Sequence, residues 1–498
     1  MLLSRSTCLA IAGIAPVALA KLWPYQSFVT EPTFHPPVLD VTKTGDELAD
    51  GLILFTPSIQ SLKDINSREL AGAMIMTDEG ELVWYGETAT PQTNLFVQKL
   101  DGKQVLTRWH GQGSNVGHGY GSVIILDDTY SPIYEICPKP DFISNDGKEY
   151  ECWADLHESF ITDQDTILVT AVNTTKADLS SVGGPVDGWI LDDWIFEIDP
   201  KTNETIFSWN SLSAGISLHL SKVSIESNNA GNGSSKLAAW DWFHMNSIQR
   251  IGDKYLLSSR HTWSIILLDR DGNVEWYLDG SDGGNFTLPS SDIFKWQHHA
   301  RIKDSTESPL QLDCFDNSNS GWDNGTNPSS GLKLELNTQD KSVKILHRLQ
   351  DLGDEIYTQS QGSFWSLDNQ NHMVGYGSIP KIKEYGPDGT TRMTIRFGED
   401  NLVQSYRSYR QEWSATPFYK PKIKVHNQTV YMSWNGATGV TQWDILAGMS
   451  KDGLKSIGTV EKKRFESSFN LTSPVPFVQI AAYSGDKLLR KSDLVSGF

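Results

Sequence analysis

The chain contains four short segments in which histidine stands beside arginine, asparagine or a carboxylate. Histidine is scarce in the chain as a whole, with 12 residues in 498. An imidazole can act as nucleophile, acid or base near neutral pH, and a guanidinium can bind two oxygens of one anion. The clustering therefore indicates an enzyme. The four segments are Asp155-Leu156-His157-Glu158, Trp242-Phe243-His244-Met245-Asn246-Ser247, Ser258-Ser259-Arg260-His261-Thr262 and Trp296-Gln297-His298-His299-Ala300-Arg301.

The first two segments align their polar side chains if they form β-strands, because alternate residues of a strand face the same side. His244 and Asn246 would then present an imidazole and an amide on one face. Asp155 would share a face with His157, as in a carboxylate that orients an imidazole. The alternative is a structural role, in which hydrogen bonds satisfy these groups at the edge of a sheet.

The other two segments supply an arginine and a pair of histidines. Arg260 follows an apolar run and lies in a predicted turn, where its planar fork suits two oxygens of an anion. His298 and His299 are adjacent, so in a strand only one of them can face a pocket. His298 shares its side with Ala300, which leaves space beside it, and His299 shares its side with Arg301. Structural roles, including an ion pair for Arg260, remain the alternative.

The elements that must position these groups are β-strands. Helical periodicity is almost absent, and a hairpin with a polar turn recurs instead. The copies follow one another at roughly 50–70 residues, enough for a four-stranded sheet and its loops. Six copies predict a six-bladed β-propeller over residues 51–413, in which separate blades bring the polar segments to a central cavity. The predicted hairpins are 74–85, 124–136, 194–209, 265–277, 334–347 and 382–397.

The pattern changes in the C-terminal part of the chain. Short alternating strands joined by turns occupy 414–498, where Trp434 and Trp443 are placed like core residues of a small fibronectin-like β-sandwich. The alternative is a seventh blade over 422–498. The segment 36–58 either pairs with this part or closes the propeller. We therefore expect an all-β protein, a propeller followed by a β-sandwich.

The N-terminus has the features of a secretory signal peptide over residues 1–20. One arginine precedes an apolar run that ends in Ala18-Leu19-Ala20, and the run is too short to span a membrane. Residues 21–50 would follow as an N-terminal extension. Seven Asn-x-Ser/Thr sequons support a secreted, extracellular glycoprotein. They begin at Asn173, Asn203, Asn232, Asn285, Asn324, Asn427 and Asn470.

Cysteines and charge narrow the function further. Cys137 and Cys152 flank a predicted hairpin or loop, and we expect a disulfide between them, with Cys314 left as a buried thiol. The formal net charge of −19 opposes binding to nucleic acid or anionic membranes. An anionic substrate would therefore need a local basic pocket.

Motifs for cofactors are missing from the sequence. It contains no Gly-x-Gly-x-x-Gly after a strand, no P-loop, no His-Glu-x-x-His and no Cys/His spacing of a zinc site. A Gly-x-Ser-x-Gly nucleophile elbow is also absent. We expect neither a cofactor nor a metal ion.

Taken in order, the motifs resemble the arylsulfotransferase family, in its fungal secreted branch. The resemblance rests on Trp242–Ser247, Ser258–His261, Trp296–His298 and Ser433-Trp434-Asn435-Gly436-Ala437-Thr438, and it covers the chain from about residue 50 to the end. It implies a six-bladed propeller with a central active site. It also implies transfer of a sulfuryl group from a phenolic sulfate to a phenol, without a nucleotide sulfate donor.

The resemblance also implies roles for individual residues. His298 matches the nucleophile that becomes transiently sulfated, and Arg260 matches the arginine of the active site. His244 and Asn246 match the histidine and asparagine of the Phe-His-x-Asn motif, and His157 matches an earlier active-site histidine.

Two other functions remain open at this stage. A non-catalytic secreted propeller that binds a ligand or a protein partner would have the same fold, because fold does not determine function. A quinone-dependent dehydrogenase is also a tryptophan-rich propeller, but it would need a calcium site of clustered acidic and amide side chains.

Overall fold

The computed structural model of this protein describes residues 23–45, 47–59, 72–86, 90–114, 116–303, 305, 307–323, 325 and 327–496. The predicted signal peptide lies outside these ranges. Within them the chain is built of β-strands, and the 3-10 turns Ser180–Val182, Leu218–Leu220 and Ile225–Ser227 span three residues each. No helix in this part of the chain is long and apolar enough to cross a membrane. The all-β prediction is confirmed.

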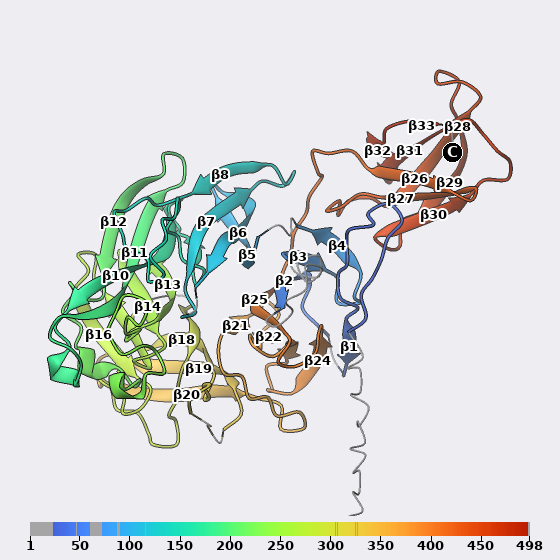
Figure 1. The fold of residues 1–498 in the computed structure, drawn as a ribbon. Coiled ribbons are helices and arrows are strands. Elements are labelled where there is room, and N and C mark those ends of the chain that lie inside the picture. Colours follow the sequence, from blue (N-terminus) through green and yellow to red (C-terminus); the bar gives the residue numbers. More distant parts are fainter. Residues whose placement is uncertain are drawn as a thin grey trace, which may run out of the picture.

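The described chain up to Gln411 forms six antiparallel sheets, five of four strands and one of five (Figure 1). Consecutive strands are hydrogen-bonded neighbours in each sheet, and in two of the sheets an edge strand comes from the other end of this region. The sheets are β25 (Val403–Gln411), β2 (Leu52–Ile59), β3 (Met74–Met76) and β4 (Leu82–Tyr85); β5 (Gln92–Leu100), β6 (Lys103–Gly113), β7 (Gly119–Leu126) and β8 (Pro132–Ile136); β9 (Ser159–Ile161), β10 (Ile167–Ala177), β11 (Gly188–Asp199) and β12 (Glu204–Asn210); β13 (Met245–Ile251), β14 (Lys254–Ser259), β15 (Ser264–Leu268) and β16 (Val274–Asp279); β17 (His298–Ile302), β18 (Leu310–Asp316), β19 (Ser330–Asn337) and β20 (Ser342–Leu349); and β21 (Ser363–Ser366), β22 (His372–Gly375), β23 (Lys381–Tyr385) and β24 (Thr391–Arg396) with β1 (Asp40–Lys43).

All six hairpins predicted from the sequence are present, each in a different sheet. The polar turns form because a carboxylate accepts backbone N–H groups and glycine adopts a positive φ. Asp269 Oδ1 accepts hydrogen bonds from the N–H of Asp271 and Asn273, and Gly272 has φ +87°. The hairpins are β3–β4, β7–β8, β11–β12, β15–β16, β19–β20 and β23–β24.

The two ends of this region pair with each other. Strand β2 runs antiparallel to β25, with Leu52 opposite Gln411, and β1 runs antiparallel to β24, with Asp40 opposite Arg396. The six sheets up to Gln411 are called the large body from here on. Of the two possibilities raised for residues 36–58, pairing within the large body is the one that occurs.

Apolar side chains fill the space between successive sheets. One cluster joins the β5–β8 sheet to the β9–β12 sheet through residues such as Val123 and Val169, and corresponding clusters lie between the following sheets. Ile53 and Ile382 belong to a cluster between the sheets that begin with β25 and β21, so the last sheet also packs against the first. These contacts fix the positions of the six sheets, and of the first strand in each sheet, relative to one another.

The C-terminal segment forms two sheets that share one core. Trp434 and Trp443 are both buried in that core, as predicted. A seventh blade would be a single four-stranded meander, so that alternative does not fit. The segment lies to one side of the larger body, beside β4, where the Asn435 side chain bonds to both backbone groups of Tyr85 (Figure 1). Its sheets are β26 (Lys422–His426), β27 (Thr429–Ser433) and β30 (Glu466–Asn470); and β29 (Lys455–Glu461), β28 (Gln442–Gly448), β31 (Phe477–Ser484) and β32 (Lys487–Lys491), with β33 (Val495–Ser496) on β31.

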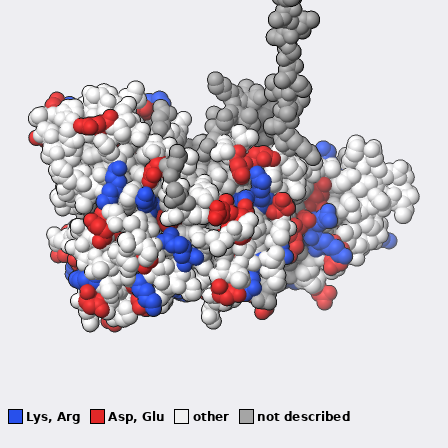
Figure 2. Space-filling model, turned by 90° about the horizontal axis from the view of Figure 1, so that it is seen from below, with Lys and Arg blue, Asp and Glu red and all other residues white. Residues whose placement is uncertain are grey.

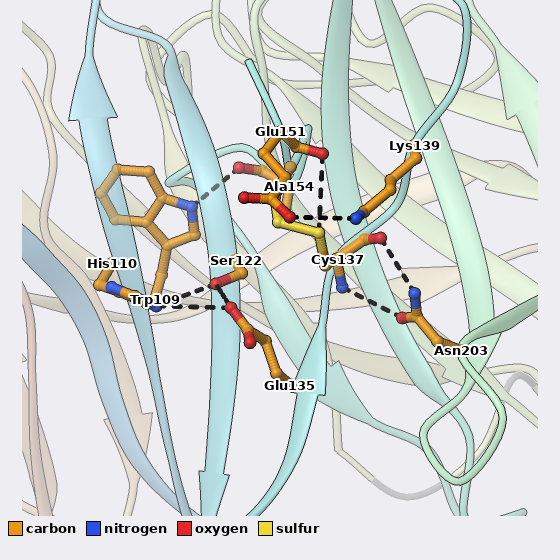
Figure 3. Close-up of a disulfide and its surroundings, with 10 residues drawn as sticks. Trp109, His110, Ser122, Glu135, Cys137, Lys139, Glu151, Ala154 and Asn203 are labelled. Carbon is orange, nitrogen blue, oxygen red and sulfur yellow. Dashed lines mark hydrogen bonds and ion pairs between the residues drawn. A yellow bond between two sulfur atoms is a disulfide. The ribbon is translucent and has the colours of Figure 1, made fainter.

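The expected disulfide joins Cys137, just after β8, to Cys152, ahead of β9 (Figure 3). Asn203 lies against it, because its amide accepts the Cys137 N–H and donates to the Cys137 carbonyl, both at 3.0 Å. Cys314 on β18 is buried and unpaired, as expected.

Surface charge alone does not indicate where an anion would bind. Figure 2 shows acidic and basic side chains interspersed over the face seen there. Several arginines are instead buried inside the large body, among them Arg260, Arg301 and Arg407. These buried guanidiniums are therefore candidates for binding an anion in the interior.

Candidate active site

A cavity of about 390 Å³ receives side chains from all six sheets of the large body. Thr56 of β2, Gln92 of β5, His298 of β17 and Tyr406 of β25 line it directly. The remaining sheets contribute through the segments that lead into β9, β13 and β21. The titratable lining residues are His118, His157, Asp241, His244, Arg260, His261, His298 and Tyr406. Four of the five residues expected from the sequence thus face one cavity.

His157 lies in a turn ahead of β9 and not in the expected strand, but Asp155 still orients its ring as expected. Its Nδ1 is 2.5 Å from Asp155 Oδ2, and Asp155 also accepts the backbone N–H groups of His157 and Gly119. Burial alone would raise the pKa of Asp155, but His157 and His118 outweigh it and hold that pKa well below its usual range. Asp155 is therefore an anion that fixes the ring of His157.

His244 faces the cavity for a reason other than strand alternation. It precedes β13, its φ is +57°, and the pairing of β13 with β14 is irregular between Met245 and Ser247. The expectation that His244 and Asn246 share one strand face is therefore wrong, because a left-handed residue breaks the alternation. Asp241 Oδ2 holds His244 Nδ1 at 2.6 Å. Burial lowers the pKa of His244 well below its usual value, and the nearby His118 adds to that effect.

Asn246 lies behind the cavity wall. Its Nδ2 donates to the Gln297 carbonyl at 2.7 Å, one residue before His298, and its own carbonyl accepts from Arg407 at 2.8 Å. The structure thus places Asn246 as a link between the His244 and His298 segments.

Arg260 lies in the turn between β14 and β15, as expected. Its Nη1 donates to His261 Nε2 at 2.7 Å, and His261 Nδ1 lies 2.5 Å from the Asp241 carbonyl. The guanidinium packs over the rings of Trp296 and Trp322, at 5.1 and 5.3 Å. Burial lowers the pKa of Arg260 to about 10, so it remains a cation at neutral pH. Its hydrogen bonds to His261 and to the Gln359 carbonyl use two N–H groups of the guanidinium, so others remain for an anion.

His298 presents a defined tautomer to the cavity. Asn317 Nδ2 donates to the carbonyls of Thr358 and Gln361, so its Oδ1 is an acceptor and takes the Nδ1–H of His298 at 2.7 Å. The Nε2 lone pair then accepts only a long, 3.2 Å bond from the Gln361 N–H. Burial and the nearby Arg260 lower the pKa of His298 well below its usual value, which keeps the ring neutral.

His299 points away from the cavity. Its Nδ1 bonds to the Phe364 carbonyl at 3.0 Å and its ring packs near Trp365 and Tyr409. Only one of the two adjacent histidines faces the cavity, as expected, and it is His298. Regular strand alternation is not the reason, because His299 has φ +56° and the pairing of β17 with β18 is irregular between His298 and Arg301.

Comparison with protein families decides what kind of protein this is. The arylsulfotransferase (ASST) family model matches residues 96–398, which is more than half of the chain and includes all five expected site residues. The chain belongs to the arylsulfotransferase family. Family membership supports, at a coarse level, a sulfotransferase-type enzyme acting on phenolic sulfates and phenols.

A comparison with curated protein sequences gave no match. Among solved structures, the chain is similar to a Bacteroides caccae protein of unknown function, with 11% identity and a TM-score of 0.40 over 72% of this chain and 98% of that one. It is also similar to streptogramin B lyase, with 11% identity and a TM-score of 0.32 over 79% and 94%. An α-L-arabinanase of Penicillium chrysogenum gives 9% and 0.34 over 76% and 96%. These similarities are too low to bear on function.

Sequence reasoning did not identify His118, which lines the cavity and lies between His157 and His244. It follows Gly117 ahead of β7, and no carboxylate, arginine or other histidine is adjacent to it in the chain. Gly119 is required there, because a Cβ would approach the Trp109 ring to 2.8 Å. A histidine between glycines at the start of a strand is the only local signal.

A second missed feature is the buried ion cluster beside the cavity. Glu158 accepts hydrogen bonds from Arg301 at 2.7 Å and from Arg407 at 2.8 and 3.2 Å. Burial would raise the pKa of Glu158, but the two guanidiniums outweigh it and lower that pKa. The cluster ties together segments from three sheets directly next to His157.

Two groups of side chains at the cavity have the composition of metal ligands, which the sequence spacing did not reveal. They are His118, Asp241 and His244, and His118, Asp155 and His157. In each group the aspartate–histidine separation is 2.5–2.6 Å. Two ligand atoms at about 2.1 Å from one ion normally lie roughly 3 Å or more apart, so hydrogen bonds account better for these contacts.

Proposed function

We propose that this protein is a secreted arylsulfotransferase that moves a sulfuryl group from a phenolic sulfate to a phenol through a sulfated histidine. The proposed architecture is a six-bladed propeller over 51–413 and a fibronectin-like sandwich over 414–498. The observation that carries the proposal is the convergence of a neutral His298, the cation Arg260 and the histidines His157 and His244 on one cavity. The fungal secreted branch remains the proposed subgroup.

The proposed nucleophile is His298 Nε2. Sulfuryl transfer, like phosphoryl transfer, passes through a loose in-line transition state with charge spread over three oxygens. The Nε2 lone pair forms the N–S bond while the S–O bond to the phenolate breaks. The 3.2 Å contact with the Gln361 N–H is given up in this step. Asn317 keeps the attacking tautomer by holding Nδ1–H.

Arg260 is the group proposed to stabilise the sulfuryl oxygens. Its orientation is fixed by His261 and by a 3.0 Å bond to the Gln359 carbonyl. A preoriented cation stabilises developing charge strongly. His157 or His244 supplies the proton for the leaving phenolate and removes it from the incoming phenol. Because His298 carries the sulfuryl group between the two half-reactions, the kinetics should be ping-pong.

The decisive experiment is a nucleotide-free exchange assay with p-nitrophenyl sulfate as donor and a second phenol as acceptor. We expect His298→Ala to abolish p-nitrophenol release, with the circular dichroism spectrum unchanged. His219→Ala is the matched control, since His219 is exposed and outside the cavity. Full activity of the His298 variant, or dependence on a nucleotide sulfate donor, would refute the proposal. Mass spectrometry of the wild type should find one sulfo group on a histidine, which a non-catalytic binding protein would not acquire.

We also propose that residues 1–20 are removed on secretion and that exposed sequons carry glycans. Asn285, Asn427 and Asn470 are exposed, and the disulfide suits an oxidising compartment. Sequencing of the secreted protein should begin at Lys21, and enzymatic deglycosylation should reduce its mass. A cell-retained, unmodified protein would contradict this assignment.

A further inference from the structure

Two aspartate–histidine pairs from different sheets face the cavity. Asp155 holds His157 ahead of β9, and Asp241 holds His244 ahead of β13, in both cases through Nδ1. Because Nδ1 is occupied, Nε2 is the nitrogen of each ring that remains to exchange a proton. The two ring centres are 4.9 Å apart, so protonation of one ring acts on the other.

His118 links the two pairs. Its Nε2 is 3.3 Å from Asp241 Oδ1 and its Nδ1 is 3.6 Å from Asp155 Oδ1. Its ring centre lies 5.2 Å from that of His157 and 4.6 Å from that of His244. An imidazolium has an N–H on each nitrogen and can serve two carboxylates, whereas a neutral ring can serve only one. The geometry therefore suits a charged His118, with a hydrogen bond to Asp241 and an ion-pair contact, longer than a hydrogen bond, to Asp155.

We propose that His118 is a positioning residue that joins the two pairs as an imidazolium and restricts them to one exchangeable proton, shared between His157 and His244. Counted over the two pairs and His118 alone, two carboxylates and one imidazolium leave one negative charge. One further proton neutralises that charge. A second would place three imidazoliums within 4.6–5.2 Å of one another, where like charges repel strongly in a protein interior.

The surrounding groups agree with this charge count. Burial raises the pKa of Asp193 of β11 well above its usual value, and burial lowers the pKa of His261 to about 4. Arg260 contributes a fixed positive charge that opposes a second proton. Tyr406 of β25, 5.4 Å from the His157 ring, stays neutral because burial raises its pKa. His298 of β17 is neutral as well.

The consequence for catalysis rests on the proposed function. In the first half-reaction the S–O bond breaks and the shared proton moves from Nε2 of His157 or His244 to the leaving phenolate. In the second the acceptor phenol returns its proton to that nitrogen, its oxygen bonds to sulfur, and the S–N bond to His298 breaks. One proton is lent and recovered, so each cycle leaves the site unchanged.

The test measures histidine protonation in the free protein and therefore does not depend on sulfuryl transfer. Protein with isotope-labelled histidine rings is titrated by NMR between pH 4.5 and 8.5, and the signals are assigned with His157→Gln and His244→Gln. We expect the wild type to take up one proton on this pair over that range. In His118→Gln, loss of the cation should allow a second proton and move the uptake to higher pH by about one unit or more. His372→Gln, a buried histidine outside the cavity, is the control.

Several outcomes would overturn the proposal. If the wild type takes up two protons on this pair, or none, a single shared proton is excluded. That result can be read from the wild type without any variant. An unchanged titration in a folded His118→Gln protein reduces His118 to a packing role. A stoichiometric metal ion in the purified protein, lost in His118→Gln, would replace the proton model with a metal site. If the titration behaves as expected but no sulfuryl transfer is found, the proposed reaction fails while the coupling of the pairs holds.

Discussion

Glu158 offers a sharp test of how the scaffold holds the site. Its side chain is about 2% exposed and accepts hydrogen bonds from Arg301, Arg407 and the backbone N–H groups of Ser159 and Ile248. Glu158→Gln keeps the shape but leaves two buried guanidiniums without a counter-charge. Removing one partner of a buried ion pair costs about 3–5 kcal/mol in the free energy of unfolding.

The expected change in Tm follows from the size of the region. An unfolding entropy of about 2.1 cal/mol/K per residue, over the roughly 360 residues of 51–413, amounts to about 0.8 kcal/mol/K, so Tm should fall by about 4–7 °C. Differential scanning calorimetry at pH 7 measures it. Glu399→Gln is the matched control, because Glu399 pairs with Arg396 where both side chains are about one-third or more exposed. Exposed pairs contribute about 0–1 kcal/mol, so the control should change Tm by about 1 °C or less.

The effect of Glu158→Gln should also depend on pH. The folded pKa of Glu158 is lowered, so its stabilisation is present above the unfolded pKa of about 4.3 and is lost as the pH falls through the folded value. The difference in Tm between wild type and variant should therefore shrink below about pH 4. A variant with the Tm of the Glu399 control at pH 7 would refute the role given to this cluster.

Four further predictions follow from named contacts. Asn317→Ala removes the acceptor of the His298 Nδ1–H and should lower the sulfuryl-transfer rate about tenfold, the equivalent of one hydrogen bond, in the exchange assay; an unchanged rate would mean that the tautomer needs no support. Cys137→Ala with Cys152→Ala opens a loop with a sequence separation of 15 and should cost about 3 kcal/mol in chemical denaturation, whereas equal stability would show that the disulfide adds nothing. Trp443→Ala should cost about 3–5 kcal/mol in the C-terminal unfolding transition while leaving activity intact; loss of activity would show coupling between the two parts. Burial would lower the pKa of His118, but Asp241 and Asp155 raise it well above 6.5, so its contribution to stability is complete below about pH 6.5 and falls as the pH rises through the folded pKa. The Tm difference between wild type and His118→Gln should therefore be larger at pH 6 than at pH 9, and the reverse order would contradict a charged His118.

The sequence alone determined the local structure of this protein. Alternating apolar residues and polar turns specify hairpins, because a strand such as β15 and a turn such as 269–273 depend mainly on neighbours in the chain. The same is true of the Asp155–His157 pair, which is two residues apart. His298, His157 and Arg260 were recognised because each occurs in a distinctive short motif.

Only the tertiary structure decided which groups meet. His244 reaches the cavity through a left-handed residue that strand periodicity does not predict, and Asn246 is turned toward Gln297 instead. His118 becomes central because Asp155 and Asp241, which are 37 and 123 residues further along the chain, converge on its ring from other sheets. Contacts of this kind depend on how six sheets pack against one another, and no local pattern of residues encodes that packing.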